Sequence, residues 1–293
     1  MNRNYSQGRV YLLLFMGIFA VSFSAIFIRK TMAPASIIAM YRMLITFLLL
    51  SPITLMTRWE EIKKIAARDF FLCALSGVFL ALHFISWISS LNYTTIASST
   101  VLVGLQPIFT AILGYLLYQE RLSKLSIVGM LIAILGSSIM GILDLQINLE
   151  HLFGDALALL GALFASFYIL IGRGVRRRIS TTSYVFFTYG ICWIVLLIIN
   201  LLSGLALIGY SPIDYTLFLL MAVICTIGGH TIFNWALGYI EANKVSVAML
   251  GEPIGATILA MIFLSETPDF LQLISGGLIV LGLYIFITFN IRR

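Results

Sequence analysis

The stretch LQPIFTAILGYLLYQE at residues 105–120 shares its spacing with GEPIGATILAMIFLSE at residues 251–266. In each stretch a glutamate lies 13 residues after the proline, and a glycine lies 29 residues after it. Four residues upstream recur at a separation of 144: Gly17 with Gly161, Ser22 with Ser166, Phe23 with Phe167, and Arg29 with Arg173. The chain therefore contains an internal repeat, which predicts two structurally related halves.

The composition is that of a membrane protein. Of the 293 residues, 61% are hydrophobic and only 10% are charged, whereas a soluble domain carries about 25% charged residues. The apolar runs are continuous, which fits spanning helices of about 20 residues and not the alternating strands of a membrane β-barrel. The net charge of +6 comes from basic residues scattered among the loops, so nucleic acid is not an expected partner.

Ten spans account for the apolar runs, and the N-terminal run is interpreted as a retained span because no signal-peptide cleavage site follows it. The predicted spans are Val10–Ile28, Ser36–Met56, Phe70–Ser90, Ser98–Tyr118, Lys124–Leu143, Phe153–Gly172, Ser183–Ser203, Thr216–Ile240, Val245–Leu264 and Phe270–Asn290. The sequence thus predicts an all-α polytopic protein of ten transmembrane helices.

The basic residues predict the orientation, because cytoplasmic loops are rich in Lys and Arg. With the N-terminus in the cytoplasm, fifteen of the eighteen basic residues lie on that side. The three exceptions, Arg29, Lys30 and Arg42, lie around the first outer turn. Both termini are therefore predicted to be cytoplasmic, which independently supports an even number of spans.

The number of spans in each repeat determines how the halves are related. Each repeat holds five spans, and since five is odd the second copy must enter the membrane from the opposite side. We therefore expect two inverted five-helix repeats related by a pseudo-two-fold axis in the membrane plane. That architecture is typical of secondary transporters, whose substrate site lies near the midplane between the repeats.

Polar residues inside spans are expensive in lipid unless they face a partner or a water-filled cavity. In the third span, His83, Ser86 and Trp87 share one helical face, which continues to Ser90. The eighth span, its repeat equivalent, carries a similar set: His230, Asn234 and Trp235. One interpretation is that both faces line a central cavity and contact substrate. The alternative is hydrogen bonding between packed helices.

Glu252 is the carboxylate that lies well inside a span, next to Pro253. It could remain neutral, pair with a cation, or exchange protons during transport. Its repeat counterpart Gln106, next to Pro107, cannot titrate. The alternative role of both pairs is packing and helix bending, since proline removes a backbone donor.

Arg42 lies about two helical turns into the second span, near the expected outer face. Its side chain could extend to the lipid headgroups, or it could hold a substrate carboxylate, which a guanidinium binds with two hydrogen bonds. Tyr41 beside it suits the aromatic rim of a cavity mouth and equally an interfacial belt. The three cysteines show no metal or disulfide spacing, and no metal site or cofactor motif is found.

The sequence resembles the EamA family of the drug/metabolite transporter superfamily. The resemblance rests on residues 87–100, on Leu105-Gln106-Pro107 through Leu122, and on Gly251-Glu252-Pro253 through Glu266. It covers both halves and divides the chain into two EamA-like five-helix repeats at 10–143 and 153–291. In the related small multidrug exporters the essential carboxylate is in the first helix, whereas residues 12–28 of this chain contain none.

The resemblance implies a carrier in the bacterial plasma (inner) membrane and not an enzyme. The expected function is secondary transport, in the direction of export, of small metabolites such as amino acids, by alternating access around a central cavity. The alternatives are a multidrug exporter and a passive channel. Expected partners are a small-molecule substrate and the lipid bilayer, with proton coupling as an option and either a monomer or a homodimer as the assembly.

Overall fold

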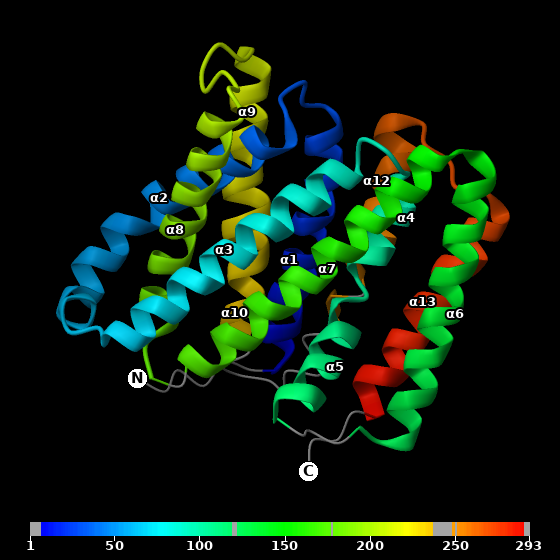
Figure 1. The fold of residues 1–293 in the computed structure, drawn as a ribbon, viewed down its shortest axis with the longest axis horizontal. Coiled ribbons are helices and arrows are strands. Elements are labelled where there is room, and N and C mark those ends of the chain that lie inside the picture. Colours follow the sequence, from blue (N-terminus) through cyan, green and yellow to red (C-terminus); the bar gives the residue numbers. More distant parts are fainter. Residues whose placement is uncertain (1–6, 119–121, 177, 237–247, 250, 290–293) are drawn as a thin grey trace.

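The computed structural model describes residues 7–118, 122–176, 178–236, 248–249 and 251–289. The side chains of a few residues inside helices, Asn234 among them, also lie outside the described part. Every regular element in these ranges is helical (Figure 1). The protein is an all-α multi-pass membrane protein, as the composition predicts.

The first half of the chain contains six described helices. These are α1 (Gln7–Arg29), α2 (Ala35–Lys63), α3 (Ala67–Ser90), α4 (Ile96–Val103), α5 (Gln106–Tyr118) and α6 (Lys124–Ile147). The second half follows directly with α7 (Leu149–Val175), α8 (Thr181–Leu202), α9 (Pro212–Leu220), η1 (Met221–His230), α10 (Thr231–Ala236), α12 (Gly251–Leu264) and α13 (Phe270–Phe289). The expected spans therefore all have helical counterparts, although residues 237–247 of the eighth and ninth lie outside the described part.

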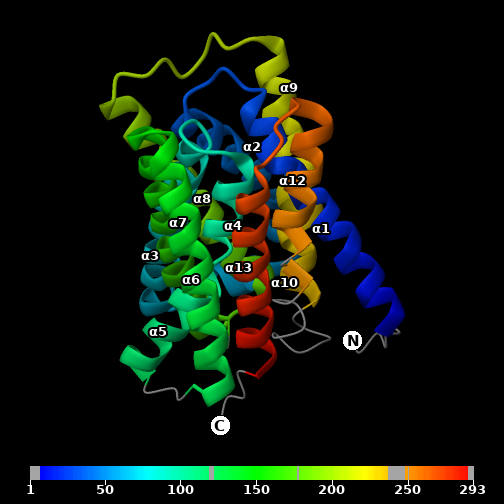
Figure 2. The same ribbon diagram turned by 90° about the vertical axis from the view of Figure 1, so that its right-hand side faces the viewer.

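Eight described helical segments are long and apolar enough to cross a membrane. Two shorter apolar helices, Lys124–Ile139 and Gly251–Leu264, occupy the fifth and ninth positions. Helix α1 begins, and helix α13 ends, at the lower end of the molecule in Figure 2. An even number of crossings requires this placement.

The sequence predicts one continuous helix for the fourth span, but the structure has two. Helix α4 ends at Val103, the chain turns at Gly104 and Leu105, and α5 begins at Gln106. Proline at position 107 has no amide hydrogen to donate to the carbonyl of Val103, so the helical ladder is interrupted there. The result is a break at mid-span, next to the Gln-Pro pair.

The eighth span also departs from a regular α-helix. Residues Met221–His230 form a π-helix, between α9 and α10. Inside it the hydroxyl of Thr226 donates to the carbonyl of Met221 at 3.2 Å, and just after its end the hydroxyl of Thr231 donates to the carbonyl of Thr226 at 3.1 Å. Such widened turns are rare and frequently occur at functional sites.

Helix contacts between the halves occur in pairs that the repeat relates. Helix α3 packs on α7, and its counterpart η1 packs on α1; likewise α4 and α5 pack on α7, and α12 packs on α1. The second spans, α2 and α8, pack on each other, and so do the last spans, α6 and α13. Figure 1 shows the α6–α13 pair at one side of the bundle.

Single residues follow the same pairing. The hydroxyl of Ser22 donates to the carbonyl of Glu252 at 3.4 Å, and the hydroxyl of Ser166 donates to the carbonyl of Gln106 at 3.0 Å. The two donors, Ser22 and Ser166, are equivalent in the sequence repeat, and so are the two acceptors, Glu252 and Gln106. The repeat is therefore visible in the hydrogen bonds of the structure as well as in the spacing of the sequence.

Candidate functional site

Arg42 lies at the centre of the helix bundle with none of its surface exposed. Its Nε donates to the hydroxyl of Thr226 on η1 at 2.8 Å, and its Nη1 donates to the hydroxyl of Ser24 on α1 at 3.1 Å. Its guanidinium carbon lies 4.7 Å from the centre of the Phe84 ring on α3. The alternative in which this side chain extends to the headgroups is therefore incorrect, because the guanidinium turns inward to polar partners on neighbouring helices.

The third guanidinium nitrogen of Arg42, Nη2, is buried and has no hydrogen-bond partner among the described residues. Among those residues no carboxylate lies within 4 Å of the guanidinium, although the carboxyl of Glu252 is near enough for a longer-range electrostatic interaction. A buried charge without a close counter-ion is costly, since burial removes its hydration. The arrangement therefore leaves a charged donor that an anion could satisfy.

The third-span face predicted from the sequence lies next to this guanidinium. The His83 ring stacks on the Trp87 ring at 6.2 Å between centroids, and it lies 5.1 Å from the ring of Phe84. Its Nδ1 hydrogen-bonds the carbonyl of Gly161 on α7 at 2.9 Å. Ser86 is buried, and the buried indole Nε1 of Trp87 has no partner among the described residues.

The second-half residues predicted from the sequence do not all join this site. His230 ends η1 and lies edge-on to Phe233 at 6.2 Å, within electrostatic range of Arg42. Trp235 instead packs into a separate cluster with the first helix, around Val10 and Leu14. The side chain of Asn234 lies outside the described residues.

The Glu-Pro and Gln-Pro pairs occupy equivalent places at the starts of helices. Glu252 and the buried Pro253 lie in the first turn of α12, and Gln106 and Pro107 begin α5. The Gln106 amide donates to the hydroxyl of Thr110 at 2.7 Å, one turn further along its own helix. The two pairs therefore differ chemically, since the polar group of Gln106 has a partner on its own helix.

Tyr41 points away from the guanidinium of its neighbour. Its hydroxyl donates to the carbonyl of Leu207 at 2.8 Å, and its ring stacks on Phe218 at 4.9 Å and lies edge-on to Tyr215 at 5.4 Å. These are contacts with the α8–α9 connection and with α9. The structure thus separates two adjacent residues that the sequence analysis groups at one cavity mouth.

Sequence analysis missed several residues that surround Arg42. Ser24 and Thr226 supply its hydrogen bonds, and Tyr189, Cys192 and Cys225 lie within electrostatic range. Each is a polar residue inside an apolar run, which is the signal that could have found them. Helical periodicity alone did not find Ser24, Tyr189 and Cys192, because α1 and α8 carry no predicted site residue with which they could share a face. Thr226 lies four residues before His230 on η1, and this spacing was the signal that could have found it.

The sequence profile of the EamA-like transporter family matches residues 8–142 and 152–288, which together cover most of the chain. The chain belongs to the EamA-like transporter family. It is therefore a transporter and not an enzyme, and the resemblance noted in its sequence is confirmed.

Relatives of this EamA-like transporter come from both bacteria and archaea. A transporter of Archaeoglobus fulgidus, itself uncharacterized, is 26% identical over 96% of this chain and 97% of its own length. An uncharacterized transporter of Bacillus subtilis is 24% identical over 75% of this chain and 71% of its own. A Salmonella typhimurium protein named a probable amino-acid metabolite efflux pump is 28% identical over 67% of this chain and 69% of its own.

A solved crystal structure shares the fold of this EamA-like transporter. It has a TM-score of 0.68 with 17% sequence identity, and the match covers 98% of this chain and 100% of the other. At this identity the similarity concerns the fold alone. The shared fold extends over almost the whole of this chain and all of the other.

Proposed function

We propose that this EamA-like transporter exports amino acids, or closely related small metabolites with a carboxylate, by alternating access around Arg42. The observation that carries the proposal is the fully buried Arg42 guanidinium, which is bound by helices of both halves and retains one unpartnered nitrogen. The name of the Salmonella typhimurium relative supports the same substrate class. We place the protein in the bacterial plasma membrane with both ends of the chain in the cytoplasm.

The paired contacts between the halves support an inverted, two-fold arrangement. Asp69 accepts from the guanidinium of Arg178 at 2.6 Å, and Asp214, which follows Asp69 by 145 residues, accepts from the amide of Met32 at 3.0 Å. Each contact joins a carboxylate of one half to the first connection of the other. Two near-equivalent halves can exchange conformations, which gives two states of similar free energy, each open to one side.

The chemistry around Arg42 suits a carboxylate ligand. A guanidinium presents its donors in a planar fork that matches a carboxylate with two hydrogen bonds. The neighbouring rings of Phe84, His83 and Trp87 offer apolar and aromatic surface to the remainder of a small substrate. A zwitterionic amino acid with an apolar or aromatic side chain therefore matches the site.

The test of this function is counterflow in liposomes that contain the purified protein. We expect vesicles preloaded with an unlabelled bulky apolar amino acid to accumulate the labelled amino acid transiently and with saturation. A passive channel shows neither saturation nor counterflow, so the assay separates the two mechanisms. If only hydrophobic drugs and no amino acid show counterflow, the amino-acid assignment is wrong and the multidrug alternative is correct.

Glu252 is the residue we propose for proton coupling, because its carboxyl lies in the electrostatic range of Arg42 at the start of α12. In an exporter that exchanges substrate for protons, an inward proton gradient increases the rate of export. We expect the wild-type rate to respond to such a gradient and the Glu252→Gln variant to lose that response while still performing counterflow. The exposed Asp269→Asn variant is the matched control and keeps the response. An identical pH profile for wild type and Glu252→Gln excludes this coupling role and leaves packing as the function of the Glu-Pro pair.

A further inference from the structure

We propose that Glu266 closes the outer end of the transport route by binding α1 and α4 at once, and that its release opens this end to the outside. We call the contacts among Glu266, Arg29 and the amide of Ile96 the outer gate. The proposal rests on the proposed function for the existence of a transport route, and on the charge distribution for which end is outside. The contacts themselves are independent of both.

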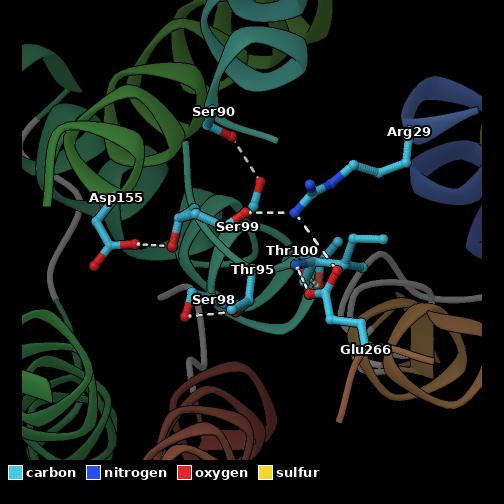
Figure 3. Close-up of polar contacts among 10 residues, drawn as sticks. Arg29, Ser90, Thr95, Ser98, Ser99, Thr100, Asp155 and Glu266 are labelled. Atoms are coloured by element: carbon cyan, nitrogen blue, oxygen red, sulfur yellow. Dashed lines mark hydrogen bonds and ion pairs between the residues drawn. The ribbon is translucent and has the colours of Figure 1, made fainter. Parts of the chain in front are cut away.

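Figure 3 shows how the outer gate is built. One carboxylate oxygen of Glu266 accepts from the backbone amide of Ile96, and the other lies 3.5 Å from Nη2 of Arg29. The same guanidinium nitrogen donates to the carbonyl of Thr94 at 2.8 Å. Because the Ile96 amide is one of the first in α4, it has no partner within that helix, and an acceptor with negative charge suits it. One side chain thus joins α12, α1 and the start of α4.

The outer gate connects the two halves of the chain. Arg29, Thr94 and Ile96 belong to the first matched range, and Glu266 belongs to the second. On its other side the same connection is held by α7, because the hydroxyl of Thr94 donates to the carboxylate of Asp155 at 3.0 Å (Figure 3). Because α12 packs on α1, separation of this helix pair from α4 requires Glu266 to leave the amide of Ile96 and Arg29 to leave the carbonyl of Thr94.

The backbone presents Glu266 in a constrained position. Ser265 has φ 55°, and the amide of Glu266 donates to the carbonyl of Ala260 at 3.3 Å. Serine thus occupies the left-handed position after the end of α12, where glycine is usual. A left-handed backbone conformation is strained for a residue other than glycine. It persists only where the surrounding structure holds it, and such residues cluster at functional sites. The strained turn brings the glutamate to the amide of Ile96.

The outer gate lies on the same helices that contact or approach Arg42. Helix α1 supplies Ser24 to the guanidinium and Arg29 to the gate, and α12 carries Glu252 near its start and leads into Glu266 at its end. The gate side chains of Arg29 and Glu266 are 30% and 23% exposed, so water reaches them. An ion pair that is partly hydrated is weak enough to break during a transport cycle.

Cys225 provides a reporter for the gate, since it is buried on η1 within electrostatic range of Arg42. With Cys73→Ser and Cys192→Ser in the background, a membrane-impermeant maleimide reports access to Cys225. In right-side-out vesicles we expect Glu266→Gln to increase the labelling rate about 10-fold, which is the effect of losing one typical charge-assisted hydrogen bond. Arg29→Gln, which keeps the bond to the Ile96 amide, is expected to give a smaller increase.

The matched control is Asp269→Asn, which removes the same charge from the same connection at an exposed position. We expect it to label at the wild-type rate. Equal rates for Glu266→Gln and Asp269→Asn overturn the proposal. So does an equal increase in right-side-out and inside-out vesicles, because that result shows a loosened fold and not an opened outer end. The assay uses no amino acid, so absence of amino-acid counterflow refutes the proposed function without affecting this result.

Discussion

Replacement of Arg42 by glutamine is expected to reduce amino-acid counterflow at least about 100-fold, since two hydrogen bonds to a charged group contribute about 1.5–3 kcal/mol each. Replacement by lysine keeps the charge but not the planar fork, so we expect an intermediate loss of about 10-fold. The Arg58→Gln variant serves as the control, because Arg58 is an exposed arginine on the same helix. We expect it to transport at the wild-type rate.

A structural role for Arg42 predicts a different pattern from substrate binding. Arg42 also donates to Ser24 and Thr226, so its loss could disturb the packing of α1 and η1. The comparison that separates the roles uses amino-acid amides, which lack the carboxylate. If Arg42 binds the carboxylate, Arg42→Gln loses its preference for the acid over the amide. If transport of acid and amide falls equally, or if the variant transports normally, Arg42 does not recognise the substrate.

Replacement of Gly282 by alanine is expected to destabilise the protein by about 1–3 kcal/mol, the usual cost of overpacking, and to lower its melting temperature by about 5–10 °C. Helices α6 and α13 approach closely along glycines. A Cβ at Gly282 would lie 2.6 Å from the carbonyl oxygen of Gly129, and a Cβ at Gly129 would lie 2.5 Å from the amide nitrogen of Phe286. Both obstacles are backbone atoms, so no side chain can move aside to admit the methyl group.

Gly277 on the same helix is the matched control, because a Cβ there meets nothing within 4 Å. In an open position alanine favours a helix over glycine by about 1 kcal/mol, so Gly277→Ala is expected to leave the melting temperature unchanged or slightly higher. Thermal unfolding of the purified variants in detergent measures the difference. Equal melting temperatures for the two variants contradict the close packing of α6 and α13.

The apolar spans, the internal repeat and the membership of the EamA-like family could all be predicted from the sequence. A run of about 20 apolar residues determines a membrane helix locally, because lipid leaves the backbone no partner except itself. The 13-residue spacing from Pro107 to Glu120 and from Pro253 to Glu266 required no structure to be seen. The equivalence it implies reappears in the bonds of Ser22 and Ser166 to the carbonyls of Glu252 and Gln106.

The candidate site was only partly predictable. The face of His83 and Trp87 was found because helical spacing of polar residues is a local property of α3. Trp235 was grouped with His230 by proximity in sequence, but it packs against α1. Trp235 follows His230 by five residues, mostly within the α-helix Thr231–Ala236, and five residues turn an α-helix by about 140°. Trp235 therefore lies on a different face from His230 and meets different neighbours.

The sequence by itself determined which segments cross the membrane, that the chain is duplicated, and that Arg42 is an unusual residue within a span. Only the tertiary structure decided that Arg42 turns inward, that Tyr41 beside it turns to the α8–α9 connection, and that Glu266 binds α1 and α4 together. The physical reason is that these outcomes depend on partners far apart in sequence. Thr226 lies 184 residues from Arg42, and Glu266 lies 237 residues from Arg29. Hydrophobicity places a residue in the membrane, whereas packing between helices decides which neighbours its side chain meets.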